Sequence, residues 1–432
     1  MSDLAPARFL WLPGIMRPPA ILPRKQEVVF LLVGTTMLFS GYDLSVYSLA
    51  LPQIQHALSI PENAVGLTVS LFRLAAFATL FIAPFADVFG RRRLLLLTVF
   101  AEALFTIATA FVQNQDQFIA VQMLARIFGF CEEALCFVVI AEEIDEKVRG
   151  WSIGTLGAMN AAGAGLASLA FAFVDVLPFG WRALYVLGGS ALLVLSYFRR
   201  WLPETSRFER RRAEIAKQQS KASATLHALI GLARAYPGRL AAMMIAVFAN
   251  GFAIAPAVVL ASKYLQEFRH YQPLQITLLY LCGGFLSVVG NVLAGRFSDR
   301  LGRRRVLITS AAASGVFFAL LYGGTGNAAA AAAWIVAVFG YLAADALLAG
   351  YAAEIFPTAY RATASTVRYV TSIFGGALSL ALEGLFYDRF GGHGPAISLM
   401  LTALPLAIVA ILYLPEPARR RLEELSEEHL VS

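Results

Sequence analysis

Residues 83–93 read APFADVFGRRR, and residues 295–305 repeat the pattern as GRFSDRLGRRR. The two copies are 212 residues apart, because Asp87 of the first corresponds to Asp299 of the second (299 − 87 = 212). The same offset relates further pairs along the chain: Glu142 and Glu354, Arg149 and Arg361, and Pro203-Glu204 and Pro415-Glu416. Matches in one register with no slip predict a tandem duplication in which both halves follow the same plan.

The composition indicates what each half contains. Of the 432 residues, 58% are hydrophobic and 15% are charged, whereas soluble domains carry about 25% charged residues. A helix needs about 20 predominantly apolar residues to cross the hydrocarbon core, and the chain supplies roughly a dozen such runs. The runs are too long and too uniformly apolar for barrel strands. The sequence therefore predicts an all-α membrane protein with about twelve transmembrane helices in two pseudo-symmetric six-helix bundles.

The chain is expected to divide into tails, bundles and a connector. The expected boundaries are residues 1–27 for a cytoplasmic N-terminal tail, 28–201 for the N-terminal six-helix bundle, 202–237 for a cytoplasmic connector, 238–414 for the C-terminal six-helix bundle and 415–432 for a cytoplasmic C-terminal tail. The expected spans are residues 28–51, 64–86, 94–112, 118–141, 151–174, 183–201, 239–264, 274–296, 306–323, 328–350, 362–387 and 395–414.

Positive charges lie in alternate loops and predict the orientation. The loops after even-numbered spans carry Arg91-Arg92-Arg93, Lys147 with Arg149, the basic connector, Arg303-Arg304-Arg305 and Arg361. Residues 53–63, 113–117 and 324–327 contain no Lys or Arg. By the positive-inside rule, both termini and the connector are cytoplasmic. Compact loops and the absence of glycosylation-rich segments favour a bacterial inner membrane. The net charge of +7 does not indicate a nucleic-acid partner.

Cysteine and histidine residues indicate no metal or redox site. Cys131, Cys136 and Cys282 lie within apolar runs and are interpreted as small core residues. The histidines lie in loops, the connector and the tail without forming a metal set: His56, His227, His270, His393 and His429. The chain has no Walker loop, so ATP is not the expected energy source. We expect no enzyme activity, cofactor or metal. The expected state is a monomer whose partners are a small-molecule substrate, protons and the lipid bilayer.

The motifs and the duplication together resemble the major facilitator superfamily. The pattern D-x-x-G-R-R-R follows spans two and eight, and E-x6-R follows spans four and ten. Residues 202–207, LPETSR, and the LPE at 414–416 are similar to the sugar-porter, organic-ion and metabolite–proton symporter branches. One departure is Ala83, where the family's motif usually begins with Gly, as Gly295 does in the second copy. Helix packing at Ala83 is therefore expected to be looser.

The resemblance implies a cytoplasmic latch that holds the ends of the halves together in the outward-open state. Arginine at a helix end can bind neighbouring carboxylates and exposed helix-terminal groups. The latch residues implied are Asp87, Gly90, Arg91, Arg93, Glu142, Arg149, Asp299, Gly302, Arg303, Arg305, Glu354 and Arg361. The alternative is that the basic residues only fix the topology, which we favour for Arg92 and Arg304.

A charged pair is expected in the middle of the first bundle, because ionisable residues inside spans are costly and usually functional. Asp43 lies in the first span, within GYDLS, and Arg126 lies in the fourth. At about 1.5 Å per residue, both lie roughly 22 Å from the cytoplasmic edge, so their depths allow a pair. In the symporter branches that the chain resembles, such an Asp and Arg act as a proton switch. We expect proton coupling by Asp43 and Arg126; the alternative is a static structural pair.

Further polar residues suggest a charged cavity wall. Glu133 corresponds to Asp345 in the second half (345 − 133 = 212), and the resemblance places both in helices that line a central cavity. Glu132 and Glu133 point about 100° apart on a helix, and which of them faces the cavity is left open. We favour Asn160 and Asn250 as substrate contacts by residue type.

Other charges within spans are interpreted as structural. Arg73 in span two and Glu102 in span three are expected to form an ion pair. Arg368 is a further charge within a span, and Glu383 in span eleven is expected to reach interfacial water.

The sequence therefore predicts a secondary active transporter that works by alternating access. The favoured function is proton symport of a small polar metabolite, such as an organic acid or a sugar-like compound. One alternative is a proton-driven exporter of organic cations or drugs. A second is a membrane sensor that binds a ligand without transporting it.

Overall fold

A computed structural model describes residue 18 and residues 22–82, 91–200, 229–324, 326–357 and 360–416. The described residues form helices joined by short turns, and no strand occurs among them. Each predicted span coincides with one helix or with consecutive helices. The predicted all-α fold is confirmed.

The described residues of the first half form ten helical elements. They are α1 (Arg24–Leu49), α2 (Leu51–Leu58), η2 (Glu62–Ala64), α3 (Val65–Arg73), η3 (Leu74–Ala78), α4 (Thr79–Ile82), α6 (Arg91–Thr109), α7 (Gln115–Glu143), α8 (Glu146–Phe171) and α9 (Trp181–Arg199). The second predicted span is thus not one regular helix, because the 3-10 segment η3 interrupts it directly after Arg73. A 3-10 stretch within a helix often marks a functional or strained position.

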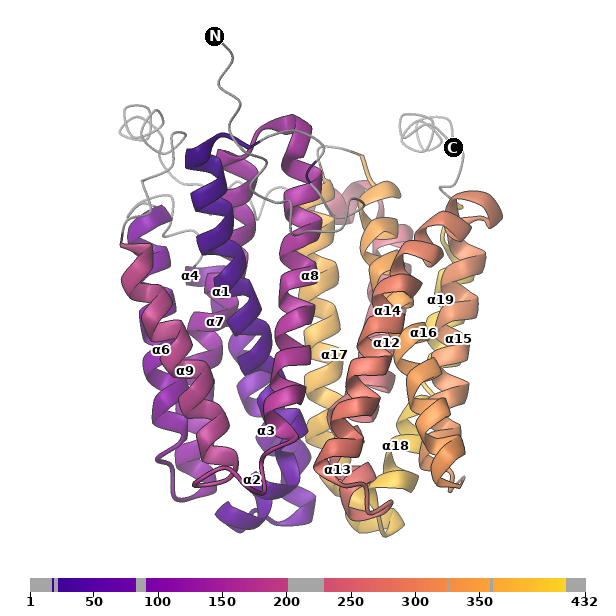
Figure 1. Ribbon diagram of the computed structural model, residues 1–432. Coiled ribbons are helices and arrows are strands. Elements are labelled where there is room, and N and C mark those ends of the chain that lie inside the picture. Colours follow the sequence, from indigo (N-terminus) through magenta and orange to yellow (C-terminus); the bar gives the residue numbers. More distant parts are fainter. Residues whose placement is uncertain are drawn as a thin grey trace.

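Eight helices occur in the part of the second half that the structure describes. They are α12 (Pro237–Val259), α13 (Ala261–Glu267), α14 (Pro273–Leu301), α15 (Arg303–Tyr322), α16 (Asn327–Glu354), α17 (Arg361–Phe390), α18 (His393–Leu401) and α19 (Leu404–Tyr413). Figure 1 shows the two halves side by side, with the first half in indigo to magenta and the second in orange to yellow. Contacts between the halves join α3 to α17 and α8 to α14.

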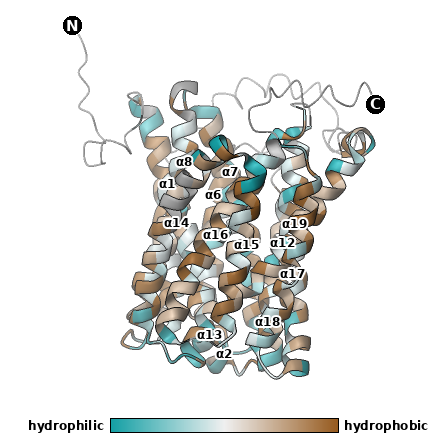
Figure 2. Ribbon diagram, turned by 90° about the vertical axis from the view of Figure 1, so that its right-hand side faces the viewer, coloured by the Kyte–Doolittle hydropathy of each residue, from teal (hydrophilic) through white to brown (hydrophobic). Residues whose placement is uncertain are grey.

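Eight of the described helices are long and apolar enough to cross a membrane by length and composition. Hydrophobic residues cover the middle of the helices, and hydrophilic residues gather at the two ends of the molecule (Figure 2). Helix α7 misses this criterion although it is long, because it carries Arg126, Glu132 and Glu133 within its span. Charged residues within a membrane span are usually functional, so these three residues are candidates for the functional site.

Small residues allow α1 and α8 to pack backbone against backbone. A Cβ added to Gly163 of α8 would lie 1.8 Å from the carbonyl oxygen of Leu38, and one added to Gly41 of α1 would lie 2.0 Å from that of Asn160. No larger side chain fits at either position without moving the helices apart. Glycine at these crossings is typical of close helix packing in membranes.

The two ends of the molecule differ in how the halves meet. We call the end where α1 begins and α19 ends the terminal end, and the end that holds α2 and α13 the distal end (Figure 1). At the distal end, one buried hydrophobic cluster includes residues of both halves, such as Ile54 and Leu260. At the terminal end the buried clusters are separate: one belongs to the second half, around Tyr351, and one to the first, around Phe30. Among the described residues, the halves therefore share a core only at the distal end.

Candidate functional site

A cavity of about 330 Å³ lies between the two halves. Side chains from α1, α3, η3 and α7 form one wall, and side chains from α16 and α17 form the other. The lining residues are Leu44, Tyr47, Phe72, Arg73, Ala76, Arg126, Phe130, Tyr341, Asp345, Arg368, Tyr369, Ser372 and Ile373. A ligand in this cavity would touch both halves of the chain at once.

The cavity wall is aromatic and carries a net positive charge. Three guanidinium groups, from Arg73, Arg126 and Arg368, line it together with the single carboxylate of Asp345. Phenylalanine and tyrosine rings make up much of the remaining wall. Guanidinium groups bind carboxylates through charge-assisted hydrogen bonds, and aromatic rings pack against flat apolar groups. The wall is suited to a small anion with an apolar body.

Arg126 is held from behind the cavity wall by Asp43. Its Nη1 lies 2.9 Å from Asp43 Oδ2, and its Nη2 donates to the Asp43 carbonyl oxygen at 2.9 Å. Nη2 also donates to Gln122 Oε1 at 3.1 Å, and the guanidinium lies over the Tyr47 ring, 5.4 Å from its centroid. Thr106 donates to Asp43 Oδ1 at 3.3 Å. Both charged groups are buried, and only Arg126 reaches the cavity.

A second ion pair reaches the cavity from the other half. Arg368 Nη1 lies 3.5 Å from Asp345 Oδ1, and the Asp345 side chain is 44% exposed. This pair is looser than the pair of Asp43 and Arg126 at 2.9 Å. Asp345 therefore lines the cavity where the sequence predicted it, but next to an arginine that was not assigned to the site.

The chain resembles known proteins along most of its length. The sequence model of the Major Facilitator Superfamily matches residues 33–291 and again 243–431. This chain belongs to the Major Facilitator Superfamily. It is 25% identical over 402 residues to a probable 4-methylmuconolactone transporter of Cupriavidus pinatubonensis, with 90% of each chain covered. It is 24% identical to the cis,cis-muconate transport protein of Acinetobacter baylyi, covering 83% of this chain and 87% of that one.

Further similarity supports the same fold. The gallate transporter of Pseudomonas putida is 24% identical, with 89% of this chain and 90% of that one covered. Among solved structures, the inward-open xylose transporter XylE of E. coli superimposes with a TM-score of 0.74 at 17% identity, covering 93% of this chain and 99% of that one. The protein is thus an integral membrane transporter of this superfamily, and not an enzyme.

The superfamily motif of the second half forms a charged cluster at the terminal end. Arg303 Nη1 lies 2.8 Å from Asp299 Oδ1, and its Nε lies 2.5 Å from Glu354 Oε2. The carboxylate of Glu416 accepts hydrogen bonds from the backbone N–H groups of Arg303 and Arg304, at 2.9 and 3.0 Å. An acidic residue at a helix N-terminus stabilises α15 in this way.

The remaining latch residues of the second half are placed around this cluster. Gly302 separates α14 from α15 with a φ of +101°, which favours glycine. Arg361 Nε donates to the Phe356 carbonyl oxygen at 3.4 Å, and Arg305 is exposed. These contacts of Arg303 and Arg361 lie within the second half. The latch role stays a prediction.

The first copy of the motif lies mostly outside the described residues. Asp87 and Gly90, together with Ala83, belong to residues 83–90, which the structure does not describe. The side chains of Arg91 and Arg149 also lie outside it. Two latch residues of the first half are described: Arg93, which is exposed at the start of α6, and Glu142, which lies near the end of α7.

The expected ion pair between Arg73 and Glu102 is wrong. Arg73 lines the cavity, and among the described residues it has no ion-pair partner. Glu102 lies on α6, where Ser40 Oγ donates to its two carboxylate oxygens at 3.2 and 3.4 Å. A charged residue within a span is usually functional. Without the assumed partner Glu102, this rule predicts that Arg73 belongs to the site.

The structure distinguishes the two adjacent glutamates on α7. Glu132 is fully buried and points away from the cavity, where it pairs with Arg199 of α9 and accepts a hydrogen bond from Thr98 at 2.7 Å. Of the two candidate cavity glutamates, Glu132 therefore does not line the cavity, because it pairs with Arg199 inside the first bundle. Glu133 is half-buried and close enough to Tyr369 to act on it electrostatically.

The two asparagines chosen by residue type do not line this cavity. Asn160 lies where α8 packs on α1, with its Nδ2 3.5 Å from the Met37 carbonyl oxygen. Asn250 is buried within α12, 6% exposed. Tyr341, Tyr369 and Ser372 supply the polar groups that the sequence did not single out. They lie at ordinary helical positions without a distinguishing motif.

Proposed function

We propose that this protein is a proton-coupled symporter of small organic acids. The observation that carries the proposal is the position of Arg126, which lines the cavity while Asp43 holds it from behind. A substrate carboxylate in the cavity and the carboxylate of Asp43 compete for the same guanidinium. A proton on Asp43 ends that competition in favour of the substrate.

The charge balance of the site supports coupling in the same direction. With Asp43 ionised, three guanidinium groups face two carboxylates, and the net charge is +1. A proton on Asp43 raises the net charge to +2 and loosens Arg126. Anion binding is thereby favoured, and by thermodynamic reciprocity a bound anion favours the proton. The carrier with both proton and anion bound, and the carrier with neither, are therefore favoured over the carrier with only one of them. Symport requires this preference.

The names of the similar proteins support an acidic cargo. Two of them are named for cis,cis-muconate and gallate, which are carboxylates. An aromatic wall with Arg73 from the first half and Arg368 from the second fits such compounds better than it fits a sugar or an organic cation.

The two halves are proposed to act as the moving units of alternating access. The core shared at the distal end and the separate cores at the terminal end describe a conformation that is closed distally. By the positive-inside rule, the basic loops support a cytoplasmic location for the terminal end. The conformation is then inward-facing, in a bacterial inner membrane, with residues 28–201 and 238–414 as the bundles and the tails and connector inside.

The test is proton movement into proteoliposomes that enclose a pH-sensitive dye. Gallate, 4-hydroxybenzoate and muconate are added outside, and uptake of the same compounds is followed by radiolabel. Internal acidification that accompanies uptake is expected. Because weak acids also cross lipid in their neutral form, the controls are empty liposomes and liposomes with Asp43→Asn, which reveal the passive rate.

Each outcome decides between functions. Acidification and uptake no faster than in the controls would contradict organic-acid symport. Internal alkalinisation driven by an external organic cation would instead support a proton-driven exporter. Binding of an acid without any uptake would support a sensor.

A further inference from the structure

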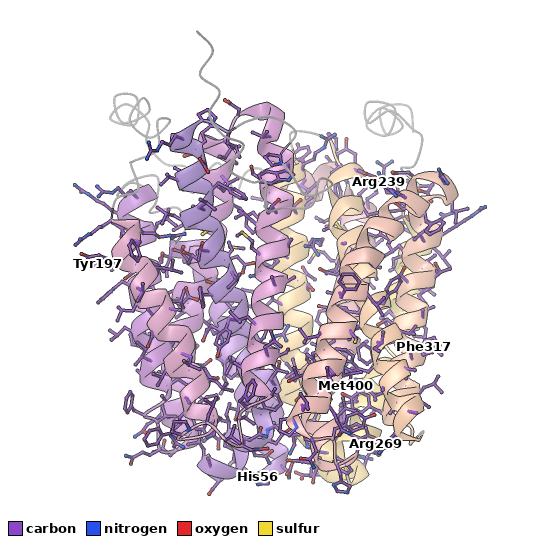
Figure 3. All side chains as sticks on the ribbon, in the orientation of Figure 1. His56, Tyr197, Arg239, Arg269, Phe317 and Met400 are labelled. Carbon is purple, nitrogen blue, oxygen red and sulfur yellow. The ribbon has the colours of Figure 1, made fainter. Side chains whose placement is uncertain are left out.

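A second cluster of charged side chains joins the two halves at the distal end, where Figure 3 labels His56, and lies away from the cavity. Glu62 comes from η2 of the first half, and the cations that meet it come from the second half. Lys263 Nζ lies 3.0 Å from Glu62 Oε2, and His393 Nε2 lies 2.9 Å from the same oxygen. The side chains of Lys263 and His393 are almost completely buried. A buried cation is stable only when it is paired.

His393 contacts a carboxylate through each of its ring nitrogens. Nδ1 lies 2.6 Å from Glu383 Oε1, and Nε2 lies 2.9 Å from Glu62 Oε2. A neutral imidazole has a single N–H, whereas an ionised carboxylate can only accept. Two such contacts at hydrogen-bond distance therefore require a proton beyond those of neutral His393. The closed distal end holds that proton.

The charged neighbours of His393 come from every element packed around it. Within the second half, Glu383 and Lys263 act on it directly, and the Tyr387 ring lies 4.6 Å from the imidazole ring. Further charged or titratable groups close by are Glu267, which pairs with Lys263; His56, 3.4 Å from Glu267; and Asp388, which accepts from Asn63 at 2.9 Å. Of these neighbours, Glu62, His56 and Asn63 belong to the first half.

The contacts depend on an approach of the halves that only the closed distal end permits. A Cβ on Gly66 of α3 would lie 2.3 Å from the Leu380 carbonyl oxygen, and a Cβ on Gly384 of α17 would lie 1.7 Å from that of Asn63. Opening the distal end must separate these backbones, and Glu62 then leaves both Lys263 and His393. The second half keeps Glu383 beside His393 and Glu267 beside Lys263.

We propose that His393 is a second proton-binding site, separate from Asp43, that takes a proton from the external side when the distal end closes. The external location of the distal end rests on the proposed function, whereas the two-carboxylate contact of His393 does not. The proton returns to the same side when the distal end reopens. It is therefore a gating proton and is not carried across the membrane.

The direction of the pH effect follows from the number of carboxylates. The closed state gives His393 two carboxylate partners and the open state gives it one, so the closed state binds the proton more tightly. Its contribution to closure is complete at acidic pH and is lost as the pH rises through the range in which His393 titrates. Acid outside closes the distal end, and alkali opens it.

Glu62 sets the acid limit of this effect. Burial acts to raise the pKa of Glu62, but its hydrogen bonds with His393 and Lys263 and the Lys263 charge outweigh burial and lower the pKa to about 2. Its contribution to closure is present above its pKa in the open state and is lost as the pH falls towards about 2. Closure is therefore strongest between the titration ranges of Glu62 and His393.

The test measures the distance between spin labels on the two halves at the distal end. Labels are placed at exposed Ala57 of α2 and exposed Arg389 of α17 through cysteine substitutions, with exposed Cys282 replaced by Ser. The protein is kept in nanodiscs without substrate, and the short-distance population is followed across the range in which histidine titrates. As the pH rises through that range, the ratio of closed to open protein should fall by about tenfold, which corresponds to about tenfold tighter proton binding in the closed state.

His393→Gln should make this ratio independent of pH. The matched control is His56→Gln, which changes an exposed histidine of the same cluster and should keep the pH dependence. Asp43→Asn should keep it too. If Asp43→Asn abolishes the dependence and His393→Gln keeps it, the second site is overturned while the proposed symport stands.

A second variant covers the case in which His393→Gln does not fold. Glu62→Gln keeps the size of the side chain but removes the second carboxylate from His393. The midpoint of closure should then move to lower pH by about one unit. A midpoint unchanged in Glu62→Gln would overturn the proposal.

Discussion

Two ion pairs reach the same cavity from opposite halves, and they are held very differently. The pair of Arg126 and Asp43 is 2.9 Å long with side chains 4% and 2% exposed, and the Asp43 carbonyl and Gln122 hold the same guanidinium. The pair of Arg368 and Asp345 is 3.5 Å long with side chains 14% and 44% exposed. The two pairs are not equivalent in the duplication, because Asp345 corresponds to Glu133 (345 − 133 = 212) and not to Asp43. We propose that the tightly held first pair acts as the proton switch and that the looser second pair leaves Arg368 available to a ligand.

The largest effect is expected when the switch is removed. Asp43→Asn keeps the shape of the side chain but cannot release a proton, so gradient-driven accumulation should fall by about 100-fold, as for other essential proton-transfer groups. Counterflow exchange, which needs no net proton movement, should persist. Radiolabelled uptake and counterflow in proteoliposomes measure both.

The matched control is the acidic residue of the other pair. Asp345→Asn should retain accumulation, because its partner Arg368 remains in the cavity. Equal loss of accumulation in both variants would remove the distinction between the two pairs. Loss of counterflow as well as accumulation in Asp43→Asn would contradict its role as a proton site.

An intermediate effect is expected at the loosely held arginine. Arg368→Gln should raise the apparent KM for an organic acid by about tenfold, which corresponds to one charge-assisted hydrogen bond. The coupling ratio of protons to substrate should not change. Arg368→Lys should recover part of the affinity, because the charge is kept and the planar fork is lost. An unchanged KM in Arg368→Gln would exclude it from the binding surface.

A smaller effect is expected from the hydroxyl that supports Asp43. Thr106→Val removes the hydrogen bond to Asp43 Oδ1 and destabilises the ionised carboxylate. Asp43 should then bind its proton more tightly, and the alkaline limb of the uptake profile should move to higher pH by about half a unit, since one hydrogen bond is worth about 0.5–1.5 kcal/mol. Thr36→Val is the control, because the buried Thr36 hydroxyl donates to the Leu32 carbonyl oxygen of its own helix at 3.1 Å. A shift to lower pH would contradict the arrangement.

The smallest effect is expected at an exposed pair. The Asp299 side chain is 65% exposed beside Arg303, so Asp299→Asn should lower the stability of the purified protein by less than about 1 kcal/mol. Thermal unfolding followed by the fluorescence of buried tryptophans measures this change. A much larger loss would mean that the cluster at the terminal end stabilises the fold as strongly as a buried pair does.

The fold was predictable because membrane insertion imposes a simple rule on composition. Runs of apolar residues predicted where the helices lie, and the offset of 212 residues indicated the duplication. The interruption of the second span at η3 was not predictable, because Leu74 and Ala75 are ordinary helical residues. The 3-10 turn depends on how α3 packs against its neighbours, which the local sequence does not encode.

The depth of the site residues along their helices was predictable, but the directions of their side chains were not. Counting the helical rise placed Asp43 and Arg126 at one level, and the structure places their side chains 2.9 Å apart. The same count says nothing about which neighbouring helix a side chain meets. Glu132 pairs with Arg199, and Arg73 has no ion-pair partner in the part of the chain that the structure describes.

No sequence motif predicted the cluster at the distal end. Glu62 and His393 are 331 residues apart, and neither belongs to a recognisable motif. Glu383, expected to reach interfacial water, is instead fully buried against His393. Only the approach of the two halves brings these groups together, and no local pattern records that approach.

The hydrophobic core shared by both halves at the distal end gives the conformational equilibrium a temperature dependence of its own. Opening that end must split a cluster that includes Ile54 and Leu260 and expose its apolar surface to water. Exposure of apolar surface carries a positive heat capacity, and hydrophobic contacts weaken on cooling. Cooling therefore weakens the contribution of this core to the closed state of the distal end. That contribution follows a curve with temperature and not a straight van't Hoff line, even at a pH where no group titrates.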